Sequence, residues 1–383
     1  MSKIDDLIKE LCPNGVEWKK LGEVFDMRNG YTPSKANPEF WTNGNIPWFR
    51  MEDIRDKGRF LSDSSLHITK SAIKGKGLFS ANSFILATTA TIGEHALLIV
   101  DSLANQRFTN LKICKSLEEK LDVKFMFYYM DIVDRFCKEH TNKSGFESVD
   151  MQALRNMDIP LPPLPIQTEI VRILDKFVEQ QEQLERLIEL RKKQYEYYRE
   201  EMLKPKEGEK WERKTLGEIG KNLDSKRKPI TSSKRKKGPY PYYGASGIVD
   251  HVEGFIFDGT YLLISEDGAN LITRSTPIAF TIEGKNWVNN HAHVIEIEDY
   301  NVRRLVEIYL NSISLEEFIS GGAQPKLNQE NLNKITIPLP TTEHLSFIIK
   351  FLDSFETTIT TLTTALELSK KRYEYYRDKM LRF

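Results

Sequence analysis

Eight basic residues crowd a short stretch in the second half of the chain. From Lys221 to Gly238 they stand against a single acidic residue, Asp224. The aromatic stretch Tyr240-Pro-Tyr-Tyr-Gly-Ala-Ser246 follows directly. Basic side chains neutralise phosphates, and rings, hydroxyl groups and glycine backbone can pack against sugars and bases. The pattern therefore indicates a nucleic-acid contact, with a solvated basic loop as the alternative.

The first half carries a weaker version of this pattern in the segments Arg28-Asn-Gly-Tyr-Thr-Pro-Ser-Lys35, Ile46-Pro-Trp-Phe-Arg50 and Asn105-Gln-Arg107. In the DNA major groove Arg and Lys pair with guanine, and Asn and Gln pair with adenine, so a few such side chains suffice to read bases. The residues that we expect to contact DNA are Arg28, Tyr31, Ser34, Lys35, Trp48, Arg50, Gln106 and Arg107 in the first half, and Lys226, Arg227, Lys228, Arg235, Lys236, Tyr242, Tyr243, Ser246, Asn290 and His291 in the second.

A catalytic interpretation is possible for Asp267 and Glu283-Gly-Lys285, because they have the loose spacing of a metal-dependent nuclease core. That chemistry needs both carboxylates on one ion and the lysine beside the attacked phosphate. Such a pattern arises easily by chance in a chain in which 29% of the residues are charged. A site-specific nuclease is therefore kept only as an alternative.

Three other catalytic patterns are incomplete. Asn37-Pro-Glu-Phe40 is similar to the Asn-Pro-Pro-Phe motif of adenine methyltransferases, but its second Pro is missing and no Gly-rich turn precedes it. His291 and His293 alternate on a predicted strand and should face one side, but no third metal ligand is marked, so we expect polar contacts there. A phosphate-binding Gly-x-x-x-x-Gly-Lys-Ser/Thr loop is absent, which argues against an ATPase. We expect no catalytic residue, no metal and no cofactor on this chain.

Three motifs recur at a constant offset of 178 positions, as from Ile159 to Ile337. The repeated pairs are Ile159-Pro-Leu-Pro162 and Ile337-Pro-Leu-Pro340, Leu174-Asp-Lys-Phe177 and Leu352-Asp-Ser-Phe355, and Tyr195-Glu-Tyr-Tyr-Arg199 and Tyr373-Glu-Tyr-Tyr-Arg377. A fixed register over this length indicates that one element has been duplicated. The chain is thus expected to consist of two similar halves.

The duplicated element is predicted to be a long amphipathic helix. Neither 168–204 nor 342–383 contains Pro or Gly, and apolar residues recur three and four positions apart in both. A seam sustained for that length is typical of a coiled coil, which we expect to be antiparallel, with Gln181 and Arg191 as polar positions that can fix its register. The seam residues that we single out are Leu174, Phe177, Leu184, Ile188, Tyr195, Leu352, Phe355, Leu362, Leu366 and Tyr373.

A globular segment precedes each predicted helix. The two segments open alike, with Leu21-Gly-Glu23 and Leu216-Gly-Glu218, and their interiors diverge. Short apolar runs bounded by Gly, Asn and Ser predict strands at 84–88, 96–100, 109–114, 261–265, 278–282 and 293–297, followed by helices at 124–137 and 302–312.

The predicted fold class is α+β, with two globular domains joined by two long helices in an antiparallel coiled coil with internal pseudo-two-fold symmetry. The predicted divisions are an N-terminal domain at 1–160, a first long-helix region at 161–205, a C-terminal domain at 206–338 and a second long-helix region at 339–383.

Composition fits a cytoplasmic protein of this size. The 383 residues suffice for two domains, and no apolar run approaches the 18 residues of a membrane span. Cys12, Cys114 and Cys137 are odd in number and lack metal-ligand spacing, so reduced thiols are expected. The net charge of zero means that any surface for a polyanion must be local.

Together these features resemble the DNA specificity subunit of type I restriction-modification systems. The resemblance covers essentially the whole chain. It rests on the doubled frame, the Ile-Pro-Leu-Pro entry to a helix that ends in Tyr-Glu-Tyr-Tyr-Arg, the Leu-Gly-Glu openings, Ile46-Pro-Trp-Phe-Arg50 and Tyr240-Pro-Tyr-Tyr-Gly-Ala-Ser-Gly247. The helix-entry and helix-exit motifs are its most specific part.

The resemblance implies two domains that each read one part of a bipartite double-stranded DNA target, and helices that set the spacer between the parts. It implies that two modification (methyltransferase) subunits dock on this chain, and that restriction (translocase and nuclease) subunits join them. S-adenosylmethionine, ATP and Mg²⁺ would then bind the partner subunits. A coiled-coil scaffold with two protein-binding domains uses the same architecture without DNA and is the remaining alternative.

Overall fold

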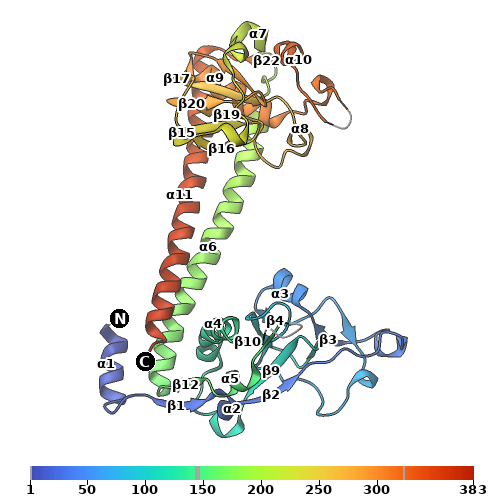
Figure 1. The fold of residues 1–383 in the computed structure, drawn as a ribbon, viewed down its shortest axis with the longest axis vertical. Helices are drawn as coiled ribbons and strands as arrows, with labels where there is room; N and C mark the ends of the chain where they lie inside the picture. The colour runs from blue at the N-terminus through green and yellow to red at the C-terminus, as the bar shows by residue number, and fades with distance from the viewer. Residues whose placement is uncertain (1, 143–146, 322–323) are drawn as a thin grey trace. The chain divides into compact units, whose positions relative to one another are not determined.

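The computed structural model describes residues 2–142, 147–321 and 324–383. The chain divides into two compact units, Met1–Gln183 with Leu366–Phe383, and Leu184–Ala365. Two long helices, α6 (Leu164–Met202) and α11 (Thr342–Met380), contribute to both units. Each unit therefore contains one globular domain and a stretch of each long helix (Figure 1).

The first domain contains short strands, one long helix and several short ones. Its helices are α1 (Ser2–Leu11), α2 (Leu21–Val24), α3 (Met51–Lys57), α4 (Val123–Glu139) and α5 (Met151–Arg155). Its strands are β1 (Glu17–Lys20), β2 (Phe25–Asn29), β3 (Ile46–Phe49), β4 (Phe60–Leu61), β5 (His67–Ile68), β6 (Ser83–Ala87), β7 (His95–Leu98), β8 (Leu103–Ala104), β9 (Phe108–Ile113), β10 (Thr141–Asn142), β11 (Ser148–Val149) and β12 (Asp158–Leu161).

The second domain has the same kind of content. Its helices are α7 (Leu216–Ile219), α8 (Asn270–Thr273), α9 (Tyr300–Ser312) and α10 (Gln329–Lys334). Its strands are β13 (Glu212–Thr215), β14 (Lys221–Asn222), β15 (Lys237–Gly244), β16 (Gly247–Val252), β17 (Phe257–Asp258), β18 (Tyr261–Ser265), β19 (Ala279–Ile282), β20 (Lys285–Val288), β21 (Ala292–Glu296) and β22 (Thr336–Leu339).

The predicted elements are confirmed. The six strands and two helices expected inside the domains are all present, with ends displaced by no more than two residues, and both long helices form. No helix in the described part of the chain is both long and apolar enough to cross a bilayer.

A two-stranded antiparallel ribbon closes each domain. Strand β1 pairs with β12, and β13 pairs with β22, so that Glu17 lies opposite Leu161 and Glu212 opposite Leu339. The ribbons hold the Ile-Pro-Leu motifs, and a free strand edge tolerates proline because no ladder bond is lost there. The repeated sequences therefore form the entrance to each long helix.

Four strands of the main sheets follow the same order in the two domains, and the first sheet has β4 as a fifth strand at its edge. The sheets run β2-β9-β6-β7-β4 and β14-β21-β18-β19, and the central strands β6 and β18 begin and end 178 positions apart. The interiors, whose sequences diverge, thus share this four-stranded arrangement. Ladder pairing depends on backbone and on apolar alternation, so it survives when side-chain identities change.

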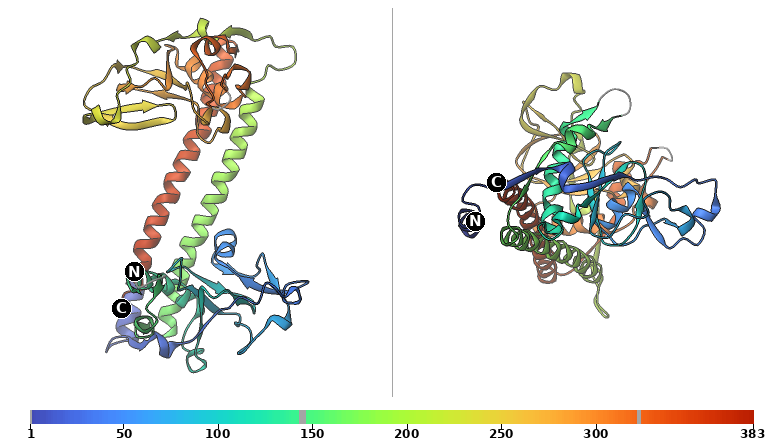
Figure 2. Two further views of the ribbon diagram at one scale, coloured as in Figure 1. Left: turned by 45° about the vertical axis from the view of Figure 1, so that its right-hand side comes forward. Right: turned by 90° about the horizontal axis from the view of Figure 1, so that it is seen from below.

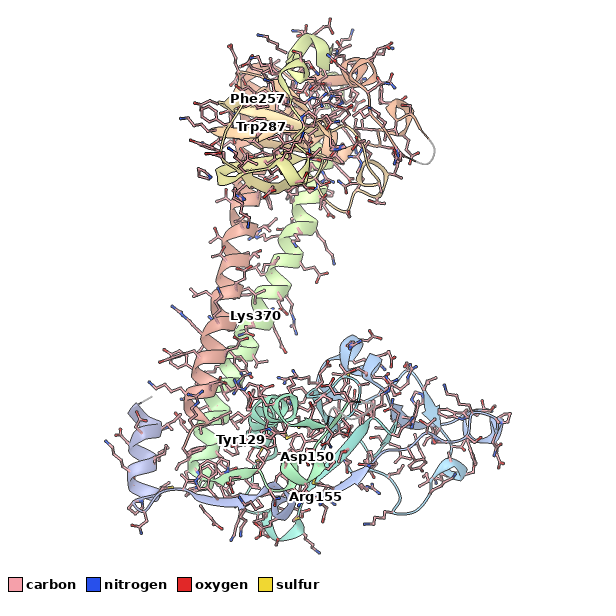
Figure 3. The ribbon with its side chains drawn as sticks, in the orientation of Figure 1. Tyr129, Asp150, Arg155, Phe257, Trp287 and Lys370 are labelled. Atoms are coloured by element: carbon pink, nitrogen blue, oxygen red, sulfur yellow. The ribbon has the colours of Figure 1, made fainter. Side chains whose placement is uncertain are left out.

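A smaller sheet covers one face of each main sheet. It runs β5-β3-β8 in the first domain and β16-β15-β20-β17 in the second. Each contains a short parallel pairing, with Trp48 opposite Leu103 and Tyr242 opposite Trp287. Figure 3 labels Phe257 and Trp287 on the neighbouring strands β17 and β20.

Helices α4 and α9 cover the other face of their sheets. Phe84 and Leu86 of β6 pack in the α4 core, while Ile85 and Ala87 pack with the smaller sheet. Leu262 and Leu263 of β18 divide between two cores in the same way. This alternation follows from the two-residue period of a strand, and it gives each domain three layers.

The long helices pair within each unit. In the first unit Phe177 stacks with Tyr376 at a centroid distance of 5.8 Å. In the second, Tyr195 Oη donates to Glu356 Oε1 at 2.6 Å, and Tyr198 lies 5.3 Å from Phe351. As the residue number in α6 increases, the residue number of its partner in α11 decreases. The two helices are therefore antiparallel (Figures 1 and 2).

The seam is closed unevenly. Leu174, Leu352 and Ile188 are buried, and the remaining predicted seam residues are half-buried: Phe177, Leu184, Tyr195, Phe355, Leu362, Leu366 and Tyr373. Gln181 and Arg191, the expected polar positions, are also half-buried.

Candidate nucleic-acid interface

An asparagine ends the parallel pairing of the smaller sheet in both domains. The side-chain oxygen of Asn105 accepts from the backbone N–H of Arg107 at 3.0 Å, and that of Asn289 accepts from His291 at 2.8 Å. The backbone N–H groups of the two asparagines donate to Phe49 and Tyr243 at 3.1 and 3.0 Å. Residues 105–107 and 289–291, here called the Asn turns, therefore have the same local structure.

The far side of each Asn turn is fastened to the main sheet. The N–H of Thr88 donates to the carbonyl of Arg107, and that of Glu266 donates to His291, both at 2.9 Å. Thr88 and Glu266 lie directly after the central strands and are again 178 positions apart. Each turn is thus held from both sheets of its domain.

The side chains that follow the asparagines point to solvent. Gln106 is exposed, and its Oε1 accepts from Thr32 Oγ1 at 2.5 Å. Arg107 is exposed and has no ion-pair partner among the described residues. The amide nitrogen of Gln106 and the guanidinium of Arg107 are hydrogen-bond donors of the kind that bind base edges.

The second Asn turn carries a different pair. Asn290 is exposed and makes no side-chain hydrogen bond within the described part of the chain. His291 Nδ1 lies 2.8 Å from Asp267 Oδ2, and half of the side chain is exposed. Because Asp267 engages Nδ1, the Nε2 atom remains available to an external partner.

A buried charge cluster supports the second turn. His293, only 1% exposed, lies between Asp224 Oδ2 at 2.6 Å and the carbonyl of Leu327 at 2.7 Å, so both ring nitrogens face acceptors. Arg227 Nη1 bonds Glu266 Oε2 at 2.6 Å. Asp224, Glu266 and His293 have metal-ligand proximity, but Arg227 and Lys326 already occupy the carboxylates, so the cluster is an ion-pair network.

The pKa values follow from this network. Burial would raise the pKa of Asp224, but the hydrogen bond and charge of His293 outweigh it and hold that pKa below its ordinary value. Burial would also raise the pKa of Glu266, but its hydrogen bonds to Arg227 and Lys326 outweigh burial and hold that pKa below its ordinary value. Both carboxylates are therefore ionised at neutral pH.

A related cluster in the first unit joins α4 to the end of α11. His95 Nδ1 lies 2.6 Å from Asp134 Oδ2, and Asp131 accepts from Arg59 at 2.6 Å and from Arg377 at 2.8 Å. These groups also have metal-ligand proximity, and both guanidinium groups bond Asp131, while Asp134 bonds His95. The role of the cluster is to fasten the long helix to the domain.

Five of the residues that we expected at DNA are buried or make contacts inside their own domain. Trp48 and Tyr242 are buried core side chains because they lie on the inner strands of the smaller sheets. Arg227 belongs to the charge cluster, Arg28 donates to the carbonyls of Gly77 and Leu78, and Tyr31 Oη donates to Ala72. Trp48 and Tyr242 are thus not available to DNA, whereas Arg28, Tyr31 and Arg227 are half-buried side chains with partners inside their domain.

The other expected residues lie at the surface to different degrees. Arg50, Arg235 and Tyr243 are half-buried, and Arg235 donates to Ile230 while lying over Tyr242. The exposed ones are Ser34, Lys35, Gln106, Arg107, Lys226, Lys228, Lys236, Ser246, Asn290 and His291. Within the basic stretch 221–238, Lys236 faces Glu253 at 3.7 Å, which reduces the local excess of positive charge.

Sequence reasoning missed Asn289, Thr32 and Asp267 as positioning residues. A signal for the first was present, because Leu103-Ala-Asn-Gln-Arg107 and Trp287-Val-Asn-Asn-His291 share an apolar pair followed by Asn. The offset between them is not 178, so a search at the main repeat register passes over the match.

The nuclease reading is excluded by the position of its carboxylates. In the β18–β19 hairpin Tyr261 lies opposite Ile282 and Ile264 opposite Ala279, so Glu283 and Asp267 follow opposite ends of the hairpin. At roughly 3.3 Å per residue they are on the order of 20 Å apart, too far to share an ion.

The histidine and Asn-Pro patterns are also resolved. We expected His291 and His293 to face one side together. Instead, exposed His291 lies against Asp267 and buried His293 lies against Asp224, so the two rings do not share a site. Asn37 caps a short 3₁₀ helix by accepting from Glu39 at 3.1 Å, which accounts for that motif structurally.

The chain has two similar domains and two paired long helices. The two domains present exposed polar side chains of different kinds from matching turns, as expected of a protein that recognises two different sites. The family model for the type I restriction modification DNA specificity domain matches residues 13–192 and 208–369. The chain is 39% identical to the type I restriction enzyme EcoprrI specificity subunit of Escherichia coli, over 95% of this chain and 93% of that protein. This chain belongs to the family of type I restriction-modification DNA specificity subunits.

Further relatives agree with this assignment. The EcoR124I/EcoR124II specificity subunit of Escherichia coli is 38% identical over 48% of this chain and 47% of its own length. Among solved structures, the S subunit from M. genitalium has a TM-score of 0.57 at 17% identity, covering 96% of both chains. The HsdS subunit from Thermoanaerobacter tengcongensis has a TM-score of 0.51 at 18% identity, covering 97% of both chains. These structures show that the whole fold is shared.

Proposed function

We propose that this chain is the DNA-reading subunit of a type I restriction-modification complex, and that each domain reads one part of a bipartite target. The observation that carries this proposal is the duplicated Asn turn, which presents different polar side chains from one backbone structure in the two domains. Exposed Lys35, Lys226 and Lys228 would contact phosphates, which position a protein on DNA without reading sequence.

The chemistry would reside on partner subunits. S-adenosylmethionine would bind two modification subunits, and ATP and Mg²⁺ the restriction subunits, while this chain contributes no catalytic group. The cluster of Asp224, Glu266 and His293 supports that division of labour, because Arg227 and Lys326 form ion pairs with its carboxylates.

A duplicated apolar surface on the long helices suits two copies of one partner. Leu190 and Tyr197 are 52% and 62% exposed, and Leu368 and Tyr375, at the 178-residue offset, are 49% and 59% exposed. Residues seven positions apart share a helix face. Large exposed apolar side chains repeated in this way mark a protein interface, and we assign it to the modification subunits.

The test is sequencing of N6-methyladenine in DNA from cells that express this chain with its modification subunit. We expect a bipartite methylated motif that disappears when this chain is omitted. If no motif depends on the chain although the assembled complex forms, direct DNA binding by that complex decides between an inactive assembly and the scaffold alternative. A complex that also fails to bind DNA would overturn the proposed function.

A further inference from the structure

The Asn turns combine a constant part with a variable part. The asparagine, its hydrogen bond to the residue two positions later and the bonds to both sheets are the same in the two domains. The two residues after the asparagine differ, being Gln106 and Arg107 in one turn and Asn290 and His291 in the other. A protein that reads two different half-sites needs this combination. Hydrogen bonds to base edges require a fixed backbone geometry, and different bases require different side chains.

We propose that the Asn turns are the base-reading elements of the two domains, with Arg107 and His291 as discriminating residues and Asn105 and Asn289 as positioning residues. This inference rests on the proposed function and adds which residues specify each half-site. The alternative, that the basic stretch 221–238 reads bases, is less suited because Arg227 and Arg235 are engaged within the domain.

The chemistry of each turn indicates what it would read. Arg107 carries a guanidinium with no intramolecular ion pair in the described chain, and a guanidinium matches the O6 and N7 acceptors of guanine. Thr32 holds the carbonyl oxygen of Gln106, so the neighbouring amide nitrogen presents a donor. The first turn is thus a donor surface, which fits a purine-containing half-site with guanine opposite Arg107.

The second turn is anchored by an acidic group. Asp267 fixes the ring of His291 through Nδ1, and its backbone pairs with Lys326 in an isolated bridge. Asn290 keeps both donor and acceptor groups free within the described residues, as bidentate pairing with adenine requires. The second turn should therefore favour adenine next to the base contacted by His291.

The first experiment compares the methylated motif made by the full complex carrying Arg107→Ala or His291→Ala with that of the original complex. Each variant should relax one or two base positions in one half-site, by on the order of ten- to hundred-fold in relative methylation, and leave the other half-site unchanged. Arg55→Ala and His251→Ala are matched controls on exposed side chains outside the turns, and should leave both half-sites unchanged.

The positioning residues have a separate readout. Asn105→Ala should alter the first half-site, and Asn105→Asp should restore it, because an aspartate oxygen can accept from the N–H of Arg107 in the same way. A merely structural role would reduce complex yield or total methylation without changing which bases are read.

A variant that loses methylation altogether is resolved by binding. The affinity of the assembled complex is measured for the original target and for targets altered at single bases. Loss of discrimination at one base, with the other half-site still required, supports the proposal. The proposal is overturned if discrimination at every base persists in both Arg107→Ala and His291→Ala while the original complex methylates a bipartite motif. Absence of any motif with the original chain would instead contradict the proposed function.

Discussion

At the scale of single residues, burial and hydrogen bonding separate supporting groups from presenting groups. Trp48 and Tyr242 looked like surface aromatics in sequence, yet both are at most 2% exposed. Arg227 lies in the most basic stretch of the chain, but its guanidinium donates hydrogen bonds to Glu266 and to the carbonyl of Ala292. Local charge therefore overstated the surface that DNA could meet.

Removing the charge of Asp224 should destabilise the second domain. Asp224→Asn removes the nearest carboxylate of buried His293 and the weaker of the two carboxylate partners of Arg227, and breaking a buried ion pair costs roughly 3–5 kcal/mol. Urea unfolding measures the loss, with exposed Asp258→Asn as the control. Equal, small effects of the two changes would contradict the network.

The same pair predicts a pH dependence. The pKa of Asp224 is lower in the folded protein than in the unfolded chain, where it is about 3.9. Its contribution to stability is thus present above that value and is lost as pH falls through the folded pKa. The melting-temperature difference between the original protein and Asp224→Asn should therefore shrink as pH falls from about 5 to about 3.

At the scale of elements, each long helix has a buried face and an exposed apolar face. Leu352 is fully buried in the core of the second unit, whereas Leu368 on the same helix is half-exposed. One helix thus both closes a domain and offers a surface to a partner.

These two leucines should separate stability from assembly. Leu352→Ala should lower the free energy of unfolding by roughly 2–5 kcal/mol, because it leaves a cavity. Leu368→Asp should leave it within about 0.5 kcal/mol but weaken binding of the modification subunit. Calorimetry of this chain and co-purification with that subunit provide the two readouts. Unchanged co-purification in a Leu190→Asp, Leu368→Asp double variant would argue against this docking surface.

At the scale of the whole molecule, duplication is the organising fact. The helix entrances, central strands and Asn turns all occur twice, and the two long helices are the same length, 39 residues. Two copies of one architecture with different side chains at the turns supply two specificities without a second fold.

Lengthening the first long helix should change the spacer of the target. An insertion of four helix-forming residues after Met202, the last residue of α6, adds roughly 6 Å of helix. We expect the gap in the methylated motif to grow by about one to two base pairs with both half-sites retained, since base pairs are about 3.4 Å apart. A changed half-site with an unchanged gap would refute the spacer role, and the same insertion in the exposed segment after Gly208 serves as a comparison.

The sequence by itself determined the duplication, the long helices, the α+β class and the buried central strands. Those features arise from local periodicity and from apolar runs such as Phe84–Ala87, which act within one element. Only the tertiary structure decided which loops form one site. The parallel pairings of Trp48 with Leu103 and of Tyr242 with Trp287 join strands about fifty residues apart. Strands β3, β8 and β20 have only two to four residues, which is too few to show a periodicity. Pairing between distant strands has no local signature, so the burial of Tyr242 and the matching of the Asn turns emerged only in three dimensions.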